Sequence, residues 1–372
     1  MDFSLSDEQK ALAELAGKII GDHAALERLK KVEGSDSRYD RDLWLELAKA
    51  GLLGAALPDD VGGSGGGFVE MCLLLEQQGK RVAMVPLLST IVAAALPLAQ
   101  FGSAEQKSLV RQVLSGDRML TAALVEPLSD PRLPSTTATA EGKDWRLKGV
   151  KLAVPLARHA ERILVPARTG DGKIGVFLLD PKSSGVRLTQ QEAWSWEPQF
   201  IVELNDVKVD TSAIVGALDS GAGVLNWIID RTMVGLCAIA SGACQEALRI
   251  TAEYTSNRKQ FDKPIAMFQA VGQRMADSFI DNEGVNLTMW QAASRLADDM
   301  PSDREIATAK YWAAEGGSRI GHAALHLHGG ICIDVDYPIH RYFLWLKQIE
   351  NTLGGATPQL ERLGKLIAAQ SA

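Results

Sequence analysis

The sequence has few cysteines and no excess of positive charge. Its four cysteines show no Cys-x-x-Cys spacing: Cys72, Cys237, Cys244 and Cys332. This pattern argues against a disulfide framework and a cysteine metal site, so we expect reduced core thiols in a cytoplasmic protein. Lys and Arg number 39 against 46 Asp and Glu, which gives a net charge of -7. Nucleic-acid binding is not expected, because neutralising phosphates requires a basic face.

Long apolar runs are also absent. The run from Ile91 to Ala99 is too short to cross a bilayer and contains proline. The N-terminal residues lack a basic segment followed by an apolar run, so no secretory signal is expected. A chain of 372 residues with 46% hydrophobic content fits two or three domains with substantial cores. We therefore expect a globular protein that does not associate with membranes.

The apolar pattern changes twice along the chain. Residues 1–118 have helical spacing, beginning with Ser6 as an N-cap and Gln9 in the capping-box position. Residues 119–215 contain short β runs separated by Gly, Pro and Asp, which predicts a small β-domain. Residues 216–372 return to helical spacing. The predicted fold class is therefore α+β, mostly α, with a helical domain on each side of the β-domain in sequence.

A glycine-rich stretch, Gly62 to Gly67, falls in the first helical region. A phosphate-binding loop would follow a strand and lead into Gly-Lys-Ser/Thr, and neither feature is present. We expect a flexible turn here.

The segment from Tyr254 to Gln269 lies between two strongly helical runs. Pro264 interrupts the helical pattern and predicts a turn that projects side chains outward. Arg258 offers a planar fork of donors that suits phosphate, while Phe261 and Phe268 offer apolar faces for a ring. The spacing alone leaves open an alternative, in which a surface arginine lies beside two core phenylalanines.

The pattern Tyr-x-x-x-Arg-x-Gln-Phe-x-x-Pro-Ile-x-x-Phe-Gln in this segment resembles a signature in the C-terminal helical domain of acyl-CoA dehydrogenases. In that family the signature reaches across a subunit interface to the FAD of a neighbouring protomer. The resemblance implies that Arg258 meets the FAD diphosphate. It also implies FAD contacts from Phe261, Phe268 and Gln269. Asp262 stands where the family usually has glycine, and we expect its carboxylate to point away from the diphosphate.

A second segment, His326 to Arg341, is similar to the family's Gln-x-x-Gly-Gly-x-Gly-Tyr region. The resemblance implies that Gly329 and Gly330 let the backbone approach the cofactor closely, a role that needs no side chain. His326 replaces the family's glutamine and still offers a ring donor for the FAD diphosphate.

A metal site is the competing interpretation of this region. His322 and His326 are four residues apart on an expected helix, and His328 is near, a spacing that can bind zinc. No acidic residue fills the positions of a His-Glu-x-x-His motif, so we expect an ordinary helix end and no metal.

Acyl-CoA dehydrogenation needs a carboxylate to remove the α-proton of a thioester while flavin accepts the β-hydride. Counting on from Gly329 places Leu353 where one branch of the family has its glutamate. The other branch has its glutamate near the position of Asp230. Asp230 is shorter than glutamate, and Glu350 is three residues out of register. These two carboxylates are the remaining candidates, and the catalytic base stays unassigned.

The expected β-domain also departs from the family. The run from Val125 to Asp130 resembles a shortened remnant of Thr-Glu-Pro-x-Ala-Gly-Ser-Asp. In the segment that matches Lys-x-Trp-Ile-Thr/Ser, Ala153 replaces the flavin-stacking tryptophan. Pro155 replaces the residue that hydrogen-bonds the flavin, and proline has no amide hydrogen to donate. Groups that serve a protomer's own flavin are missing, whereas those offered to a neighbour's flavin remain.

The resemblance covers nearly the whole chain and implies the acyl-CoA dehydrogenase fold, with a C-terminal four-helix bundle. The last segment is similar to subunits of heteromeric dehydrogenases from actinobacterial steroid side-chain β-oxidation. We therefore expect the non-catalytic half of an α2β2 acyl-CoA dehydrogenase, which shares FAD with a second dehydrogenase-like subunit and passes electrons to an electron-transfer flavoprotein. One alternative is a self-associating, self-sufficient dehydrogenase that uses Asp230 or Glu350. Another is a flavin-free structural or regulatory binding protein.

Overall fold

The computed structural model describes residues 4–170, 172–193 and 197–370. Their contacts form two compact units. Unit 1 contains Met1–Gly34, Phe68–Met84 and Met233–Ala372, and unit 2 contains Ser35–Gly67 and Val85–Thr232. The domain boundaries expected after residues 118 and 215 stay a prediction, because each compact unit combines segments that are separated in the sequence.

Helices make up the regular structure before residue 115, as the apolar spacing predicts. The predicted capping box is confirmed, because the amide of Gln9 donates to Ser6 Oγ (3.2 Å) and the amide of Ser6 donates to Gln9 Oε1 (3.0 Å). The α-helices of this part are α1 (Asp7–Asp22), α2 (Leu26–Glu33), α3 (Arg41–Lys49), α4 (Phe68–Arg81), α5 (Leu96–Phe101) and α6 (Ala104–Leu114).

The helical segment from Leu87 to Phe101 has two parts. Its first part, η3 (Leu87–Ala95), is a π-helix, and α5 continues it. Pro97 follows the π-helix closely and has no amide to close an α-helical hydrogen bond. Almost every residue of this segment is buried, so tertiary packing supports the wider turns.

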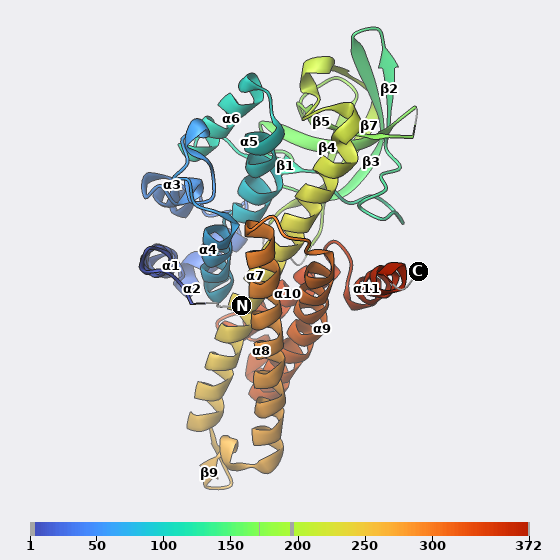
Figure 1. Cartoon of the computed structure of the whole chain (residues 1–372). Coiled ribbons are helices and arrows are strands. Elements are labelled where there is room, and N and C mark those ends of the chain that lie inside the picture. The colour runs from blue at the N-terminus through green and yellow to red at the C-terminus, as the bar shows by residue number, and fades with distance from the viewer. Residues whose placement is uncertain (1–3, 171, 194–196, 371–372) are drawn as a thin grey trace. The chain divides into compact units, whose positions relative to one another are not determined.

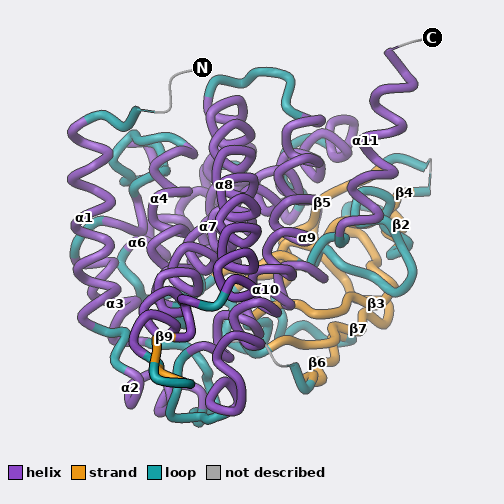
Figure 2. The backbone as a smooth tube through the Cα atoms, turned by 90° about the horizontal axis from the view of Figure 1, so that it is seen from below, coloured by secondary structure: helices purple, strands orange, loops and turns teal. Residues whose placement is uncertain are grey.

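The predicted β-domain is a mixed seven-stranded sheet in unit 2. Its strand order is β1-β4-β2-β3-β7-β6, and β5 pairs with β4. β4 runs parallel to β1 and β2, whereas the other pairs are antiparallel. The strands are β1 (Leu120–Ala122), β2 (Thr137–Glu141), β3 (Asp144–Pro155), β4 (Arg162–Thr169), β5 (Ile174–Leu179), β6 (Val186–Gln191) and β7 (Gln199–Asp210). Figure 2 shows these strands in orange.

Long helices return after the sheet, and the α+β, mostly α fold class is confirmed. They are α7 (Gly221–Asn257), α8 (Gln269–Ala297), α9 (Asp303–His328), α10 (Ile339–Asn351) and α11 (Ala356–Gln370). Within unit 1, α8 and α9 lie side by side, and α10 and α11 pack against α9 (Figures 1 and 2). By length and composition α7 could cross a membrane, but 72% of its most apolar window is buried inside the protein. Its hydropathy is therefore that of a core helix.

Two glycines set the close packing of α4 and α7 in unit 1. A Cβ on Gly79 would lie 2.1 Å from the carbonyl oxygen of Ile239, and one on Gly242 would lie 2.0 Å from that of Glu76. The absence of side chains at these two positions therefore lets the backbones of α4 and α7 approach closely. Three of the cysteines are buried as predicted, while Cys332 is half-buried, and all four are free thiols.

Candidate functional site

A tight hairpin separates α7 from α8, where Pro264 predicts a turn (Figure 1). β8 (Lys259–Gln260) pairs with β9 (Lys263–Pro264), and the two residues between them, Phe261 and Asp262, have φ angles of 53° and 65°. A two-residue connection with both φ positive is the type I′ turn that matches the twist of hairpin strands. Glycine adopts this left-handed region without strain, which gives a physical reason for the family's glycine at position 262.

The hairpin presents the predicted FAD-contact side chains to solvent. Phe261 is 85% exposed, and Arg258 and Gln269 are also exposed. Phe268 is half-buried, and its ring meets that of Phe261 edge-on at 6.2 Å. The guanidinium of Arg258 has no hydrogen bond or ion pair within the described part of the chain. The alternative of two core phenylalanines is wrong, and the hairpin carries an uncompensated cation and an exposed ring.

The second predicted segment begins at the end of α9. Gly329 has φ 64° and ψ -144°, a conformation that residues with a side chain adopt only with strain. Gly330 has no positive φ, and a Cβ there would meet no atom within 4 Å. Glycine is therefore required by the chain's own conformation at position 329 but not at position 330. His326 lies on the last turn of α9 and is exposed.

Three aromatic residues join the two segments within unit 1. The hydroxyl of Tyr254, on α7, donates to the carbonyl oxygen of His328 (3.2 Å), and their rings stack with centroids 4.4 Å apart. Nε2 of His328 lies 3.0 Å from the hydroxyl of Tyr337. Sequence reasoning assigned no role to these three side chains, and their spacing in the chain gives no sign that they touch.

A cavity of about 670 Å³ in unit 1 is lined by both segments. Arg258 and Tyr254 contribute from the first segment, and Tyr337 from the second. The other residues that line it come from four helices and their flanking loops: Ala24, Leu26, Leu29, Arg81, Val82, Glu246, Arg249, Ile250, Glu253, Asn257, Pro338 and Tyr342. Of the predicted FAD contacts, only Arg258 lines this cavity.

The carboxylates of the two candidate bases each form an ion pair within the chain. The Nη2 nitrogen of Arg132 lies 2.5 Å from Oδ1 of Asp230. Its Nη1 nitrogen donates to Oδ1 of Asn226 (2.8 Å). Glu350 lies 2.7 Å from the ammonium of Lys347, one turn earlier on α10. Arg132 was not identified from the sequence, because 98 residues separate it from Asp230.

The position that matches the glutamate of the other family branch has no carboxylate. Leu353 is 5% exposed and has φ 57°, so its apolar side chain is held in a left-handed turn. Its carbonyl oxygen accepts a hydrogen bond from Gln359 (3.2 Å). The buried ammonium of Lys310 donates to the nearby carbonyls of Ile349 (2.8 Å) and Glu350 (3.2 Å). These contacts fix the turn without supplying a base.

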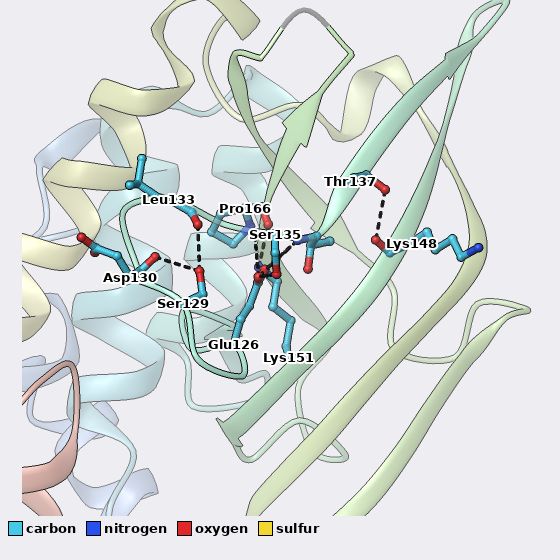
Figure 3. A network of polar contacts seen from close by, with 10 residues as sticks. Glu126, Ser129, Asp130, Leu133, Ser135, Thr137, Lys148, Lys151 and Pro166 are labelled. Carbon is cyan, nitrogen blue, oxygen red and sulfur yellow. Dashed lines mark hydrogen bonds and ion pairs between the residues drawn. The ribbon is translucent and has the colours of Figure 1, made fainter.

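The remnant in the β-domain contains a buried ion pair (Figure 3). The ammonium of Lys151 lies 2.5 Å from Glu126 and 2.7 Å from the carbonyl oxygen of Pro166. The amides of Ser135 (2.5 Å) and Thr136 (3.1 Å) donate to the same carboxylate. Burial alone raises the pKa of Glu126, but Lys151 and these hydrogen bonds outweigh it and lower that pKa to about 2.

Ala153 and Pro155, the positions that the resemblance assigns to flavin contact, lie on β3 after Lys151. Ala153 has φ 49° and lies in a register shift between β3 and β7, where its amide donates to Gln191 Oε1 (2.7 Å). Pro155 is the last residue of β3 and pairs with Gln199. Neither residue provides an aromatic ring or a side-chain donor.

The histidines of the metal alternative have other contacts. Nδ1 of His322 lies 2.8 Å from the carbonyl oxygen of Ser318, and its ring meets Phe343 edge-on at 5.0 Å. His328 belongs to the aromatic contacts described above. Across residues 4–170, 172–193 and 197–370, no group of three or more His, Cys, Asp or Glu side chains could hold a metal ion.

Comparisons with known proteins agree over the whole chain. Models of the acyl-CoA dehydrogenase N-terminal domain and C-terminal domain match residues 6–117 and 219–366. Acyl-CoA dehydrogenase FadE27 of Mycobacterium tuberculosis is 39% identical over 377 residues, which cover 99% of each protein. The ChsE4-ChsE5 complex from Mycobacterium tuberculosis matches with a TM-score of 0.94 and 40% identity over 99% of each chain. A variant of the Tcur3481-Tcur3483 steroid ACAD matches with a TM-score of 0.93 and 44% identity, again over 99% of each chain.

Proposed function

The chain belongs to the acyl-CoA dehydrogenase family and has its fold, and from this premise we propose that it is the non-catalytic subunit of a heteromeric, FAD-dependent acyl-CoA dehydrogenase. The observation that carries the proposal is the pairing of Asp230 with Arg132 (2.5 Å). Asp230 is the carboxylate nearest one base position of the family, and Leu353 occupies the other. A general base must reach the proton that it removes, so a carboxylate held by a guanidinium is poorly suited to this role.

The β-domain supports the same division of roles. FAD, when bound, supplies the hydride acceptor of this reaction. Ala153 and Pro155 offer no ring to stack on a flavin and no side-chain donor to hydrogen-bond it. The residues of this chain therefore do not fit a flavin of its own.

Arg258 and Gly330 fit the cofactor of a neighbouring subunit. The guanidinium of Arg258 is exposed and uncompensated, and a diphosphate would satisfy its fork of donors. Among the residues that the structure describes, none requires glycine at position 330, since a Cβ there would meet no atom within 4 Å. Close approach by a group outside the chain provides a reason for this glycine.

The surface of unit 1 supports association with a second subunit. Phe279, Ile280 and Leu287 are 60%, 63% and 52% exposed, and the spacing of seven or eight residues places Leu287 on the helix face of the other two. Phe261, itself a predicted FAD contact, is exposed, and further exposed apolar side chains flank the predicted contacts: Met267, Ile331, Ile333 and Val335. Exposed apolar residues in such number are typical of a protein interface.

The partner in this proposal is a second acyl-CoA dehydrogenase-like subunit, in an α2β2 assembly. Two of the structures that the chain resembles are named as pairs, ChsE4-ChsE5 and Tcur3481-Tcur3483, and the second is described as a steroid ACAD. The proposed substrate is an acyl-CoA thioester, with a steroid side chain as the proposed acyl group. The proposed electron acceptor is an electron-transfer flavoprotein in the cytoplasm. The partner supplies the base and holds the flavin ring.

Co-expression tests the proposal. The chain is produced alone and with an adjacent dehydrogenase-like gene, and native mass, flavin absorbance and acyl-CoA oxidation are measured. We expect flavin and activity only in the complex. An active, yellow homo-oligomer of this chain alone would overturn the proposal, and a complex without flavin would support a structural or regulatory binding protein instead.

Two variants of the complex sharpen this test. Arg258→Ala is expected to weaken FAD retention by about tenfold, because a charge-assisted contact to the diphosphate is lost. Gly330→Ala is expected to weaken FAD retention without lowering the stability of the chain. Arg168→Ala removes an exposed arginine outside both segments and serves as the control. Equal FAD retention in all three variants would contradict the assigned roles.

A further inference from the structure

Tyr254, His328 and Tyr337 form a cluster between the two segments that carry the predicted FAD contacts, in which His328 is buried and the two tyrosines are half-buried. We propose that this cluster is a positioning device, which holds the Arg258 hairpin and the Gly329–Gly330 turn in the relative placement that binding the partner's FAD requires. The inference rests on the proposed function, because it concerns the same cofactor contacts. It adds three residues that touch neither flavin nor substrate in that proposal.

Tyr254 connects the cluster to Arg258. It lies one helical turn before Arg258, whose amide donates to the carbonyl oxygen of Tyr254 (2.8 Å). The carbonyl of Arg258 in turn accepts from the amide of Ile265, which closes the hairpin (2.8 Å). A shift of the Tyr254 backbone would therefore move both the arginine and the hairpin.

Tyr254 also connects the cluster to the glycine turn. His328 is the last residue of α9, so its carbonyl has no partner inside that helix. The Tyr254 hydroxyl satisfies this carbonyl, directly before Gly329 leaves the helix with φ 64°. One side chain thus caps α9 at the point where the glycine turn begins.

The ring of His328 completes the connection through a defined tautomer. Nδ1 lies 2.7 Å from the carbonyl oxygen of Ala324, which can only accept, so Nδ1 carries the hydrogen. In the neutral ring Nε2 is then the acceptor for the Tyr337 hydroxyl (3.0 Å). Tyr337 follows the glycine turn, so this bond holds the turn from its other end.

The surroundings of His328 favour its neutral form. The side chain is 3% exposed, and burial lowers the pKa of His328 despite the bond to Ala324. Burial, Tyr254 and Glu253 raise the pKa of Tyr337, so the phenol of Tyr337 keeps its hydrogen near neutral pH. Protonation of His328 would place a charge in the cluster and reverse the bond to Tyr337.

The test measures FAD dissociation from the co-expressed complex by flavin fluorescence. Tyr337→Phe keeps the ring but removes the hydroxyl, and we expect it to weaken FAD retention by roughly fivefold, the usual worth of one hydrogen bond. His328→Gln keeps an acceptor near the position of Nε2 but cannot titrate. We expect it to retain FAD nearly as well as the unmodified complex at pH 7.5.

The pH profile separates positioning from simple packing. The pKa of His328 is lower in the folded state than in the unfolded state. Its contribution to stability is therefore complete above the unfolded-state pKa and is lost as pH falls through the folded-state pKa. FAD retention by the unmodified complex should fall over this range, and His328→Gln should remove that part of the pH dependence. Unchanged FAD retention in Tyr337→Phe together with the same pH profile in His328→Gln would overturn the inference. If Arg258→Ala also retains FAD fully, the proposed function itself fails.

Discussion

The guanidinium of Arg132 holds the carboxylate of Asp230 at 2.5 Å, and the two side chains are only 19% and 18% exposed. Arg132 comes from the loop that follows Glu126, and Asp230 comes from α7. The pair joins this loop to the helix. A residue that resembles a catalytic group by position is thereby part of a structural contact.

Asp230→Asn is expected to leave the activity of the complex within about twofold of the unmodified value, whereas loss of a general base costs roughly 100-fold or more. Initial rates of acyl-CoA oxidation measure the effect, and Glu350→Gln serves as the parallel variant. A 100-fold loss in either variant would identify that residue as the base and support a self-sufficient dehydrogenase.

Lys151→Met is expected to lower the free energy of unfolding by about 3–5 kcal/mol, because it leaves the buried carboxylate of Glu126 without its charged partner. The double variant Glu126→Gln/Lys151→Met removes both charges and should lose less. Chemical denaturation of the purified chain measures both values. If the single and double variants lose the same free energy of unfolding, the destabilisation comes from packing and not from the unpaired charge.

Glu126 should also make stability depend on pH in the acid range. Its folded-state pKa of about 2 lies below the ordinary value of 4.5, so its contribution is complete above pH 4.5 and is lost as pH falls towards 2. Relative to the Glu126→Gln/Lys151→Met variant, the unmodified chain should lose about 3 kcal/mol over this interval. Denaturation curves at several pH values provide the comparison, and a constant difference would refute the ion pair's role.

Gly242→Ala is expected to destabilise the chain by at least about 2 kcal/mol, because its Cβ would lie 2.0 Å from the carbonyl oxygen of Glu76. Gly272→Ala is the matched control on α8, where a Cβ meets no atom within 4 Å. It should raise stability by about 0.5–1 kcal/mol through helix propensity alone. Thermal midpoints of the two variants should therefore move in opposite directions.

Local chemistry made several features predictable from the sequence. The Ser6 capping box depends on residues three positions apart, and the hairpin between α7 and α8 depends on a proline that cannot continue a helix. The absence of a ring at Ala153, of a donor at Pro155 and of a carboxylate at Leu353 is also visible in sequence, because it is a property of the residue itself. Spacing alone left open whether Phe261 and Phe268 belong to the core, since it does not tell which helix face is covered.

The sequence by itself determined the order of helices and strands, and it identified the residues proposed for cofactor contact and the two carboxylates considered as the base. Only the tertiary structure decided which of those residues meet. Arg132 and Asp230 are 98 residues apart, and Tyr254 and His328 are 74 apart. Such pairs form when distant elements pack, and their geometry depends on the buried contacts of the whole unit. The physical reason is that propensity and capping act within a few residues, whereas packing acts across the chain.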